Sequence, residues 1–202
     1  MNRGSPRIGL FGGSFDPPHL GHLALARAAL AQLRLDELRW LPAGQPWQKL
    51  AQRAPLPGAQ RAAMLALLIE GEAGMQLDAR ELNRQGPSYS VDTVLELAAE
   101  LPGAELWLII GQDQAERLGS WHRWRELLAR VNLAIVARNG QEVRLAADVQ
   151  PWAPRLQRLE MPALPISSTL VRAAAARDED LTPMVGEKVA GYIAQHRLYS
   201  EY

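Results

Sequence analysis

Two histidines, three residues apart, stand in a glycine- and proline-rich stretch near the start of the chain. The stretch reads Gly12-Gly13-Ser14-Phe15-Asp16-Pro17-Pro18-His19-Leu20-Gly21-His22. A histidine ring nitrogen can donate a hydrogen bond to a phosphate oxygen, and the spacing of His19 and His22 lets both rings face one point. Gly12 and Gly13 let the backbone approach a ligand closely, and a helix that opens at Gly21 would offer N–H groups to an anion. These residue types indicate a phosphate-binding loop.

Other binding motifs fit this stretch less well. Its glycines are not spaced as in the dinucleotide-binding fingerprint, and no Gly-Lys-Ser or Gly-Lys-Thr follows as in a Walker loop. A His-x-x-His pair can also bind zinc, but the chain has four histidines and no cysteine, and the other two, His122 and His196, are distant in sequence. A Gly-Gly pair taken alone can be a simple strand-to-helix turn.

A second motif, late in the chain, has hydroxyl groups and a cation. It reads Ile166-Ser167-Ser168-Thr169-Leu170-Val171-Arg172 and stands where the apolar pattern predicts a helix to begin. Hydroxyls and unpaired N–H groups at a helix start can cradle a phosphate, and Arg172 follows one turn later as a fixed cation. The alternative is that the serines and threonine only cap the helix.

The elements that must position these motifs alternate along the whole chain. Apolar runs predict strands over 8–11, 37–42, 75–78, 105–110, 131–137 and 156–161. Amphipathic patterns predict helices over 21–33, 59–70, 90–101, 123–129, 167–176 and 183–196, with Ser88 or Ser90 as the cap of the third helix. The alternation predicts one α/β domain over residues 1–202, with a doubly wound, mostly parallel sheet and helices on both faces. Ligands then bind at the carboxyl ends of the strands, after Phe11, Pro42, Ile110 and Met161.

Composition excludes several classes of function. The chain has 22 Lys plus Arg and 22 Asp plus Glu, and this zero net charge disfavours a nucleic-acid-binding protein. Without cysteine, disulfides, thiolate zinc sites and a cysteine nucleophile are excluded. Apolar stretches such as 64–69 are far shorter than the roughly 18 residues of a membrane span, and no signal peptide is visible. We therefore expect a cytoplasmic protein with no membrane partner.

The two motifs closely resemble two signatures of the adenylyltransferase and cytidylyltransferase superfamily. The first matches every defined position of G-G-S/T-F-D-P-x-H-x-G-H, and the second matches I-S-S-T-x-x-R. The resemblance implies a Rossmann-like nucleotidyltransferase fold in which His19 and His22 bind a nucleotide triphosphate. They would stabilise in-line attack at the α-phosphorus as pyrophosphate leaves. The remaining ATP-binding residues that it implies are Gly12, Gly13, Ser14, Phe15, Ile166, Ser167, Ser168 and Thr169, with Arg172 as a catalytic cation.

Segments between the two motifs resemble those of bacterial nicotinate-nucleotide adenylyltransferases, and the resemblance covers nearly the whole chain. They are Pro87-Ser88-Tyr89-Ser90-x-Asp92-Thr93, the strand that ends in Gly111-Gln112-Asp113, the pair Trp121 and Trp124, and the late His196-Arg197-Leu198-Tyr199. The resemblance implies that Gly111 and Asp113 contact ATP and that Trp121 stacks on the nicotinate ring. It assigns Tyr89, Ser90 and Thr93 to the nicotinate nucleotide. The alternatives are a helix cap for Asp113 and core packing for Trp121.

One segment departs from that family. Where the family usually has Pro-His-Lys after the second strand, this chain has Pro46-Trp47-Gln48-Lys49. Lys49 keeps a cation for the phosphates, so we expect it to act with the two histidines and Arg172. Arg53 and Arg61 are further candidate cations, and Arg61 fits equally well on a solvated helix face.

The resemblance implies a defined reaction. AMP would pass from ATP to nicotinate mononucleotide, giving deamido-NAD and pyrophosphate in NAD biosynthesis, with Mg²⁺ carried by the ATP phosphates and no metal site of the protein's own. Nicotinamide mononucleotide, phosphopantetheine and a cytidylyl acceptor remain as alternative substrates. A non-catalytic nucleotide sensor is an alternative of another class. The sequence leaves open whether the chain forms a homo-oligomer.

Overall fold

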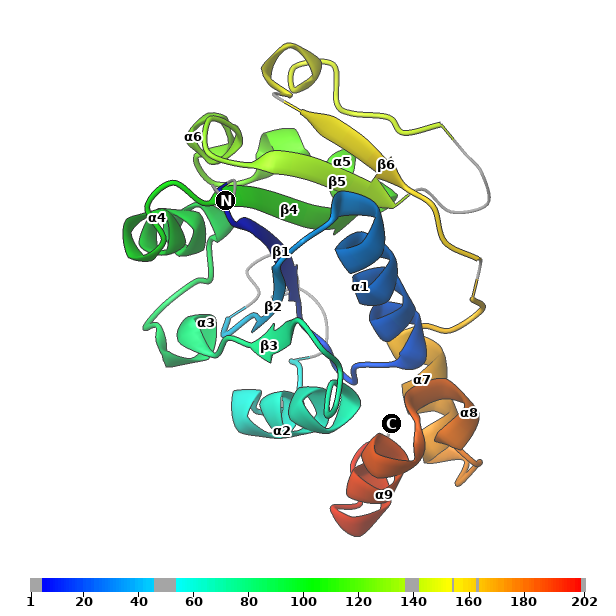
Figure 1. Ribbon diagram of the computed structural model, residues 1–202. Helices are drawn as coiled ribbons and strands as arrows, with labels where there is room; N and C mark the ends of the chain where they lie inside the picture. Colours follow the sequence, from blue (N-terminus) through cyan, green and yellow to red (C-terminus); the bar gives the residue numbers. More distant parts are fainter. Residues whose placement is uncertain (1–4, 46–53, 137–141, 154, 163, 201–202) are drawn as a thin grey trace.

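A six-stranded parallel sheet organises the chain, for which the computed structural model describes residues 5–45, 54–136, 142–153, 155–162 and 164–200 (Figure 1). The strands are β1 (Arg7–Gly13), β2 (Glu37–Pro42), β3 (Met75–Leu77), β4 (Glu105–Gly111), β5 (Asn132–Val136) and β6 (Leu156–Leu159). The longer helices are α1 (Leu20–Leu33), α2 (Gly58–Leu68), α4 (Ser90–Glu100), α6 (Trp124–Leu128), α7 (Ser168–Ala176) and α9 (Glu187–Gln195). Short helices are α3 (Arg80–Asn83), α5 (Gln112–Ala115) and α8 (Thr182–Val185), and 3₁₀ turns lie at η2 (Leu118–Ser120) and η4 (Gln150–Trp152).

The strand order is β3-β2-β1-β4-β5-β6, and every neighbouring pair is parallel. The chain moves outward from β1 to β3, then returns to lay β4 on the other side of β1. This reversal makes the gap between β1 and β4 the switch point at which such sheets bind ligands. In the register, Phe11 pairs with Trp40 of β2 and with Ile109 of β4, so the carboxyl ends of these three strands lie together.

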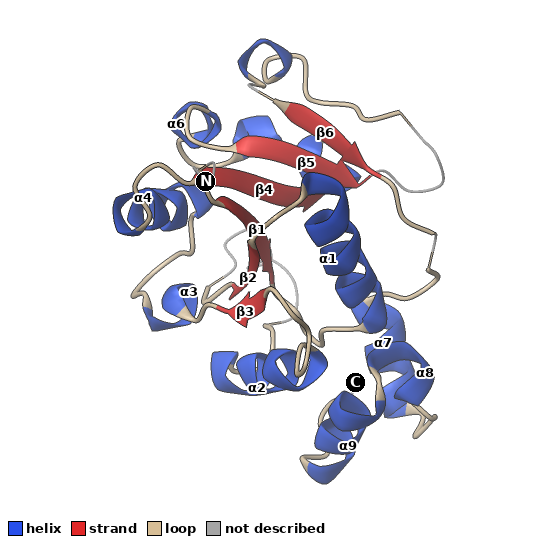
Figure 2. Cartoon of the chain, viewed as in Figure 1, coloured by secondary structure: helices blue, strands red, loops and turns tan. Residues whose placement is uncertain are grey.

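Helices cover both faces of the sheet, which confirms the predicted doubly wound architecture (Figure 2). Figure 1 shows α1 on one side of the strands and α4 and α6 on the other. Alternate residues of β1 serve the two cores: Leu10 packs with the α4 and α6 residues, and Phe11 packs with those of α1 and α2. Strands buried on both faces need apolar residues at successive positions, and this is why they appear in the sequence as unbroken apolar runs.

Two predicted details of the helices are wrong. The single helix expected over 183–196 is divided into α8 and α9 by Gly186, which has a φ of 81° in the left-handed region that glycine favours. Neither Ser88 nor Ser90 caps α4: Tyr89 is the N-cap residue and makes no side-chain cap bond. The Ser88 hydroxyl instead accepts hydrogen bonds from the backbone N–H groups of Gly44 and Gln45. It thus joins the loop after β2 to the segment before α4.

Among the described helices, none has the length and apolar character needed to cross a bilayer.

Candidate active site

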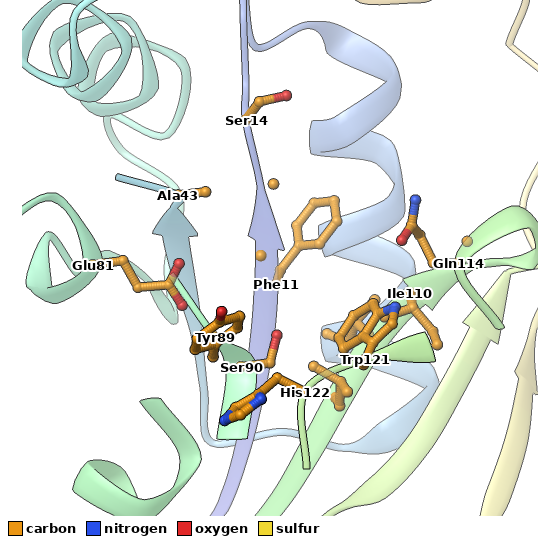
Figure 3. A pocket seen from close by; sticks show the side chains of 15 residues that line it. Phe11, Ser14, Ala43, Glu81, Tyr89, Ser90, Ile110, Gln114, Trp121 and His122 are labelled. Atoms are coloured by element: carbon orange, nitrogen blue, oxygen red, sulfur yellow. The ribbon is translucent and has the colours of Figure 1, made fainter. Parts of the chain in front are cut away.

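A pocket of about 220 Å³ lies at the switch point, at the carboxyl ends of β1 and β4 (Figure 3). Its floor is formed by the ends of these strands. Figure 3 shows Phe11, Tyr89 and Trp121 around the same space. The lining residues are Phe11, Gly12, Gly13, Ser14, Ala43, Glu81, Tyr89, Ser90, Leu108, Ile109, Ile110, Gly111, Gln114, Trp121 and His122. The pocket therefore uses three of the four strand ends at which the sequence predicts ligand binding.

The two histidines of the first motif form a reciprocal cap at the start of α1. His19 is the N-cap residue, and its Nδ1 accepts a hydrogen bond from the His22 N–H at 3.3 Å. His22 Nδ1 accepts from the His19 N–H at 3.2 Å, and the two rings stack with centroids 3.6 Å apart. Because each Nδ1 is an acceptor, the neutral rings carry their proton on Nε2. In that tautomer the Nε2–H of each ring is its hydrogen-bond donor.

Aromatic packing places the histidine pair beside the pocket, although neither ring lines it. The His22 ring lies 5.1 Å from the Phe15 ring and 6.0 Å from that of Phe11, whose side chain does line the pocket. Gly21 permits this arrangement, because a β-carbon there would stand 3.0 Å from His19 Nδ1. A larger residue at position 21 would displace the ring that caps the helix.

The two motifs for which the sequence predicts phosphate binding meet in space. Ser168 donates from its hydroxyl to the carbonyl of Pro17 at 2.8 Å, across 151 positions of sequence. Arg172 Nη1 donates to the carbonyl of Asp16 at 2.7 Å. The start of α7 therefore lies against the loop that leads into α1, which is the juxtaposition that a shared triphosphate site requires.

One hydroxyl of the second motif, that of Ser167, caps the helix, as the alternative interpretation predicts in part. Ser167 is the N-cap residue of α7, and its hydroxyl accepts from the Leu170 N–H at 3.2 Å. Arg172 Nη2 donates to Thr169 Oγ1 at 3.3 Å, which holds the guanidinium against the first turn. Capping and ligand binding are compatible here, since the cap fixes the direction of the first turn.

Arg61 corrects an expectation from the sequence. The sequence predicts that Arg61 either binds a phosphate or lies on a solvated helix face. The residue is instead buried, with only 1% of it exposed. The guanidinium donates to the carbonyls of Leu56, Ser14 and Ala43 at 2.8, 2.7 and 2.7 Å. Burial lowers the pKa of Arg61, and the nearby Asp16 and Tyr199 oppose that shift. The sequence does contain a signal, because Arg61 stands in the apolar stripe of α2 with Met64, Leu65 and Leu68.

Tyr89, Ser90 and Trp121, which the resemblance assigns to the acceptor nucleotide, all line the pocket. Trp121 also packs against the core around α6, as the alternative interpretation predicts, and its stacking on nicotinate stays a prediction. Thr93 does not line the pocket. It is 1% exposed, and its hydroxyl donates to Glu81 Oε1 at 2.7 Å and accepts from Arg84 at 3.1 Å.

Three polar residues of the pocket lining were not assigned to the site from the sequence: Glu81, Gln114 and His122. Glu81 is a buried carboxyl whose pKa is raised, chiefly by burial, while the Thr93 hydrogen bond and the Arg84 charge act in the opposite direction. The His122 ring stacks on Tyr89 with centroids 4.2 Å apart. Of these three residues, only His122 could have been suggested by the sequence, because it directly follows Trp121.

Gly111 lines the pocket and is the N-cap residue of α5. Asp113 lies exposed in the first turn of that helix, outside the pocket lining, and is not its cap. Lys49 falls outside the described residues, as do Trp47, Gln48 and Arg53. Within the described ranges, no group of three or more His, Cys, Asp or Glu side chains is placed to hold a metal ion.

Comparisons with known proteins place similar sequences in one family. The cytidylyltransferase-like family model matches residues 10–174. A probable nicotinate-nucleotide adenylyltransferase of Methylibium petroleiphilum is 48% identical over 198 residues, covering 96% of this chain and 92% of the relative. Another, of Albidiferax ferrireducens, is 45% identical over 196 residues, covering 96% and 98%.

Solved structures share the fold. The nicotinic acid mononucleotide adenylyltransferase of Plasmodium falciparum complexed with APC has a TM-score of 0.76 at 17% identity, covering 96% of this chain and 98% of the other. The same enzyme complexed with NaAD has a TM-score of 0.75 at 17% identity, with the same coverage. At such identity the likeness concerns the fold alone. By the family model and by its similarity to relatives along nearly their whole length, this chain belongs to the cytidylyltransferase-like nucleotidyltransferases and, within them, to the nicotinate-nucleotide adenylyltransferase family.

Proposed function

We propose that this chain, as one nucleotidyltransferase domain over residues 1–202, transfers AMP from ATP to nicotinate mononucleotide. The products are deamido-NAD and pyrophosphate. The observation that carries the proposal is the contact between Ser168 and Pro17, which joins two phosphate-binding helix starts beside a pocket at the switch point. Relatives from the nicotinate-nucleotide adenylyltransferase family, matched over nearly the whole chain, support the choice of substrates.

The chemistry needs little from a protein base, because the attacking 5′-phosphate of the acceptor is already an anion. Catalysis then depends on alignment and on stabilising charge at the α-phosphorus. In our proposal His19 and His22 donate from Nε2 to the phosphates, and Arg172 and Lys49 supply positive charge. An arginine has five N–H donors, so Arg172 can hold the Asp16 carbonyl and face a phosphate at once. Mg²⁺ arrives as part of the substrate, bound to the ATP phosphates.

The two substrates would occupy opposite parts of the site. ATP lies along the loop after β1 and the starts of α5 and α7. Its proposed contacts are Gly12, Gly13, Ser14, Phe15, Gly111, Asp113, Ile166, Ser167, Ser168 and Thr169. Nicotinate mononucleotide lies toward Tyr89, Ser90 and Trp121, where the electron-poor pyridine ring can stack on the indole. Thr93 acts on this side through Glu81, which its hydroxyl holds at the pocket wall.

We further propose that the enzyme works in the cytoplasm. Both proposed substrates are multiply charged nucleotides, which do not cross an apolar bilayer unaided. Its place is in NAD biosynthesis, where deamido-NAD is made from nicotinate mononucleotide.

The test is an acceptor screen that measures pyrophosphate release. Purified protein is given MgATP with nicotinate mononucleotide, nicotinamide mononucleotide or phosphopantetheine, and a parallel series replaces ATP by CTP. We expect fastest release with ATP and nicotinate mononucleotide. Faster turnover of another pair would reassign the substrate, and binding of ATP without pyrophosphate release from any pair would indicate a nucleotide sensor.

A further inference from the structure

Arg61 occupies a place in the structure that charged side chains rarely have. It stands in the core-facing stripe of α2 between apolar residues, and only 1% of it is exposed. Burying a guanidinium is costly unless its donors are all used. Some gain must therefore offset this cost.

The three hydrogen bonds of Arg61 join three segments that the sequence separates. Nη1 bonds to the carbonyl of Ser14 in the loop after β1, and Nη2 bonds to the carbonyl of Ala43 in the loop after β2. Both of these residues line the pocket. The Nε bond reaches Leu56, just before α2. One rigid, planar group thus sets the distance between two walls of the site.

Neighbouring groups keep the guanidinium in place. Asp16, next but one to Ser14, attracts the buried charge, and its Oδ1 accepts hydrogen bonds from the Tyr199 hydroxyl at 2.7 Å and from the Leu56 N–H at 3.4 Å. The Asp16 carbonyl also accepts from Arg172. The loop that carries His19 is therefore held from α2, from α7 and from the segment after α9.

We propose that Arg61 is a positioning residue for adenylyl transfer: it fixes the separation of the β1–α1 and β2–α2 loops and so aligns the reacting phosphates. The inference rests on the proposed function for the identity of the reaction. It differs from a purely structural role in one respect. A misplacement of about 1 Å between reacting groups costs on the order of 10²-fold in rate. The hydrogen bonds of Arg61 reach Ser14 and Ala43 and not Trp121, on which the pyridine ring is proposed to stack.

The test uses Arg61→Lys, with Arg61→Gln as a second, uncharged variant. Arg27→Lys is the matched control, because the Arg27 side chain is exposed on α1 and forms an ion pair with Glu72 away from the pocket lining. Titration with each nucleotide first gives the fraction of binding-competent protein, and kcat is then expressed per binding-competent molecule. We expect kcat to fall on the order of 10²-fold in the Arg61 variants, with both KM values within about threefold of wild type, and no change in the control.

Other outcomes overturn the proposal. A kcat per binding-competent molecule that stays near the wild-type value would show that Arg61 only stabilises the fold. Failure of both Arg61 variants to bind either nucleotide would lead to the same conclusion. If the wild-type protein turns over a different acceptor, the proposed function fails while the Arg61 test proceeds with that acceptor. A wild-type protein inactive with every acceptor would overturn both.

Discussion

The hydroxyl of Ser168 lies 2.8 Å from the carbonyl oxygen of Pro17, and this single bond connects the start of α7 to the loop that precedes α1. In Ser168→Ala we expect a loss of about 0.5–1.5 kcal/mol in the free energy of unfolding. Because the ATP phosphates are proposed to bridge the same two elements, KM for ATP should rise while KM for the acceptor stays constant. Urea unfolding and steady-state kinetics measure both. Ser120→Ala, which removes an exposed hydroxyl bonded to Arg117, is the control.

The His22 side chain has two roles that one variant can separate. His22→Ala removes a proposed phosphate donor, and we expect kcat to fall on the order of 10²–10³-fold. It also removes half of the reciprocal cap with His19, which should cost about 1 kcal/mol of stability. The pyrophosphate assay and thermal unfolding report the two effects. His196→Ala, at an exposed position, should change neither kcat nor stability. A folded His22→Ala protein with normal turnover would contradict the proposed role of His22 in catalysis.

Trp121 should affect one substrate only. In Trp121→Ala we expect KM for nicotinate mononucleotide to rise about tenfold, as the loss of one aromatic stacking contact implies, while KM for ATP stays within about twofold. Trp121→Phe keeps a ring in the pocket and should recover most of the affinity. An equal rise of both KM values would instead indicate that Trp121 serves the packing around α6. Trp152→Phe tests a tryptophan that lies half-exposed, away from the pocket.

Glu81 gives a prediction about pH and stability. Its pKa is raised above the ordinary value of 4.5, chiefly by burial, so the folded state binds the Glu81 proton more tightly than the unfolded state. This contribution to stability is fully present below the unfolded pKa and is lost as pH rises through the folded pKa. Relative to Glu81→Gln, the wild-type protein should therefore lose stability as the pH rises above the ordinary carboxyl pKa of 4.5. Urea unfolding of both proteins across this range measures the difference, and parallel curves would contradict the assignment.

The buried hydroxyl of Tyr199 donates to Asp16 Oδ1 at 2.7 Å. Tyr199→Phe keeps the ring and removes this bond, and hydrogen bonds to charged groups contribute about 1.5–3 kcal/mol. We expect a loss of stability in that range, measured by chemical denaturation. Tyr192→Phe is the comparison, since the Tyr192 ring packs on His196 nearer the surface and should lose much less. Equal losses of unfolding free energy in the two variants would show that the hydrogen bond from Tyr199 to Asp16 adds no more stability than an ordinary surface contact.

Sequence periodicity was enough to place the sheet and its ligand-binding edge. All six strands lie within a few residues of their predicted ranges. For β1, β4 and β5 the reason is that strands buried on both faces must be largely apolar at successive positions. The meeting of the two motifs was likewise predicted, from the signatures that contain His19 and Ser168. The break between α8 and α9 at Gly186 was not predicted, since a glycine is compatible with either a helix or a break until its neighbours are packed.

Other features depend on contacts that no local pattern encodes. Arg61 donates to carbonyls at three positions that only the folded chain brings together. Because every residue has a backbone carbonyl, the residue types at these positions do not indicate which of them accept a hydrogen bond. Ser88 was expected to cap its own helix, but the loop after β2 offered it two N–H groups instead. Glu81 enters the pocket because α3 follows β3 at the same edge of the sheet as β1 and β2.

The bond between Ser168 and Pro17 also determines when the site can exist. Translation adds residues in order, and all six strands of the sheet emerge from the ribosome before α7 does. A nascent chain can thus assemble its sheet while the histidine loop still lacks the partners that it later gains from Ser168, Arg172 and Tyr199. Nucleotide binding is then among the last properties that the growing polypeptide acquires.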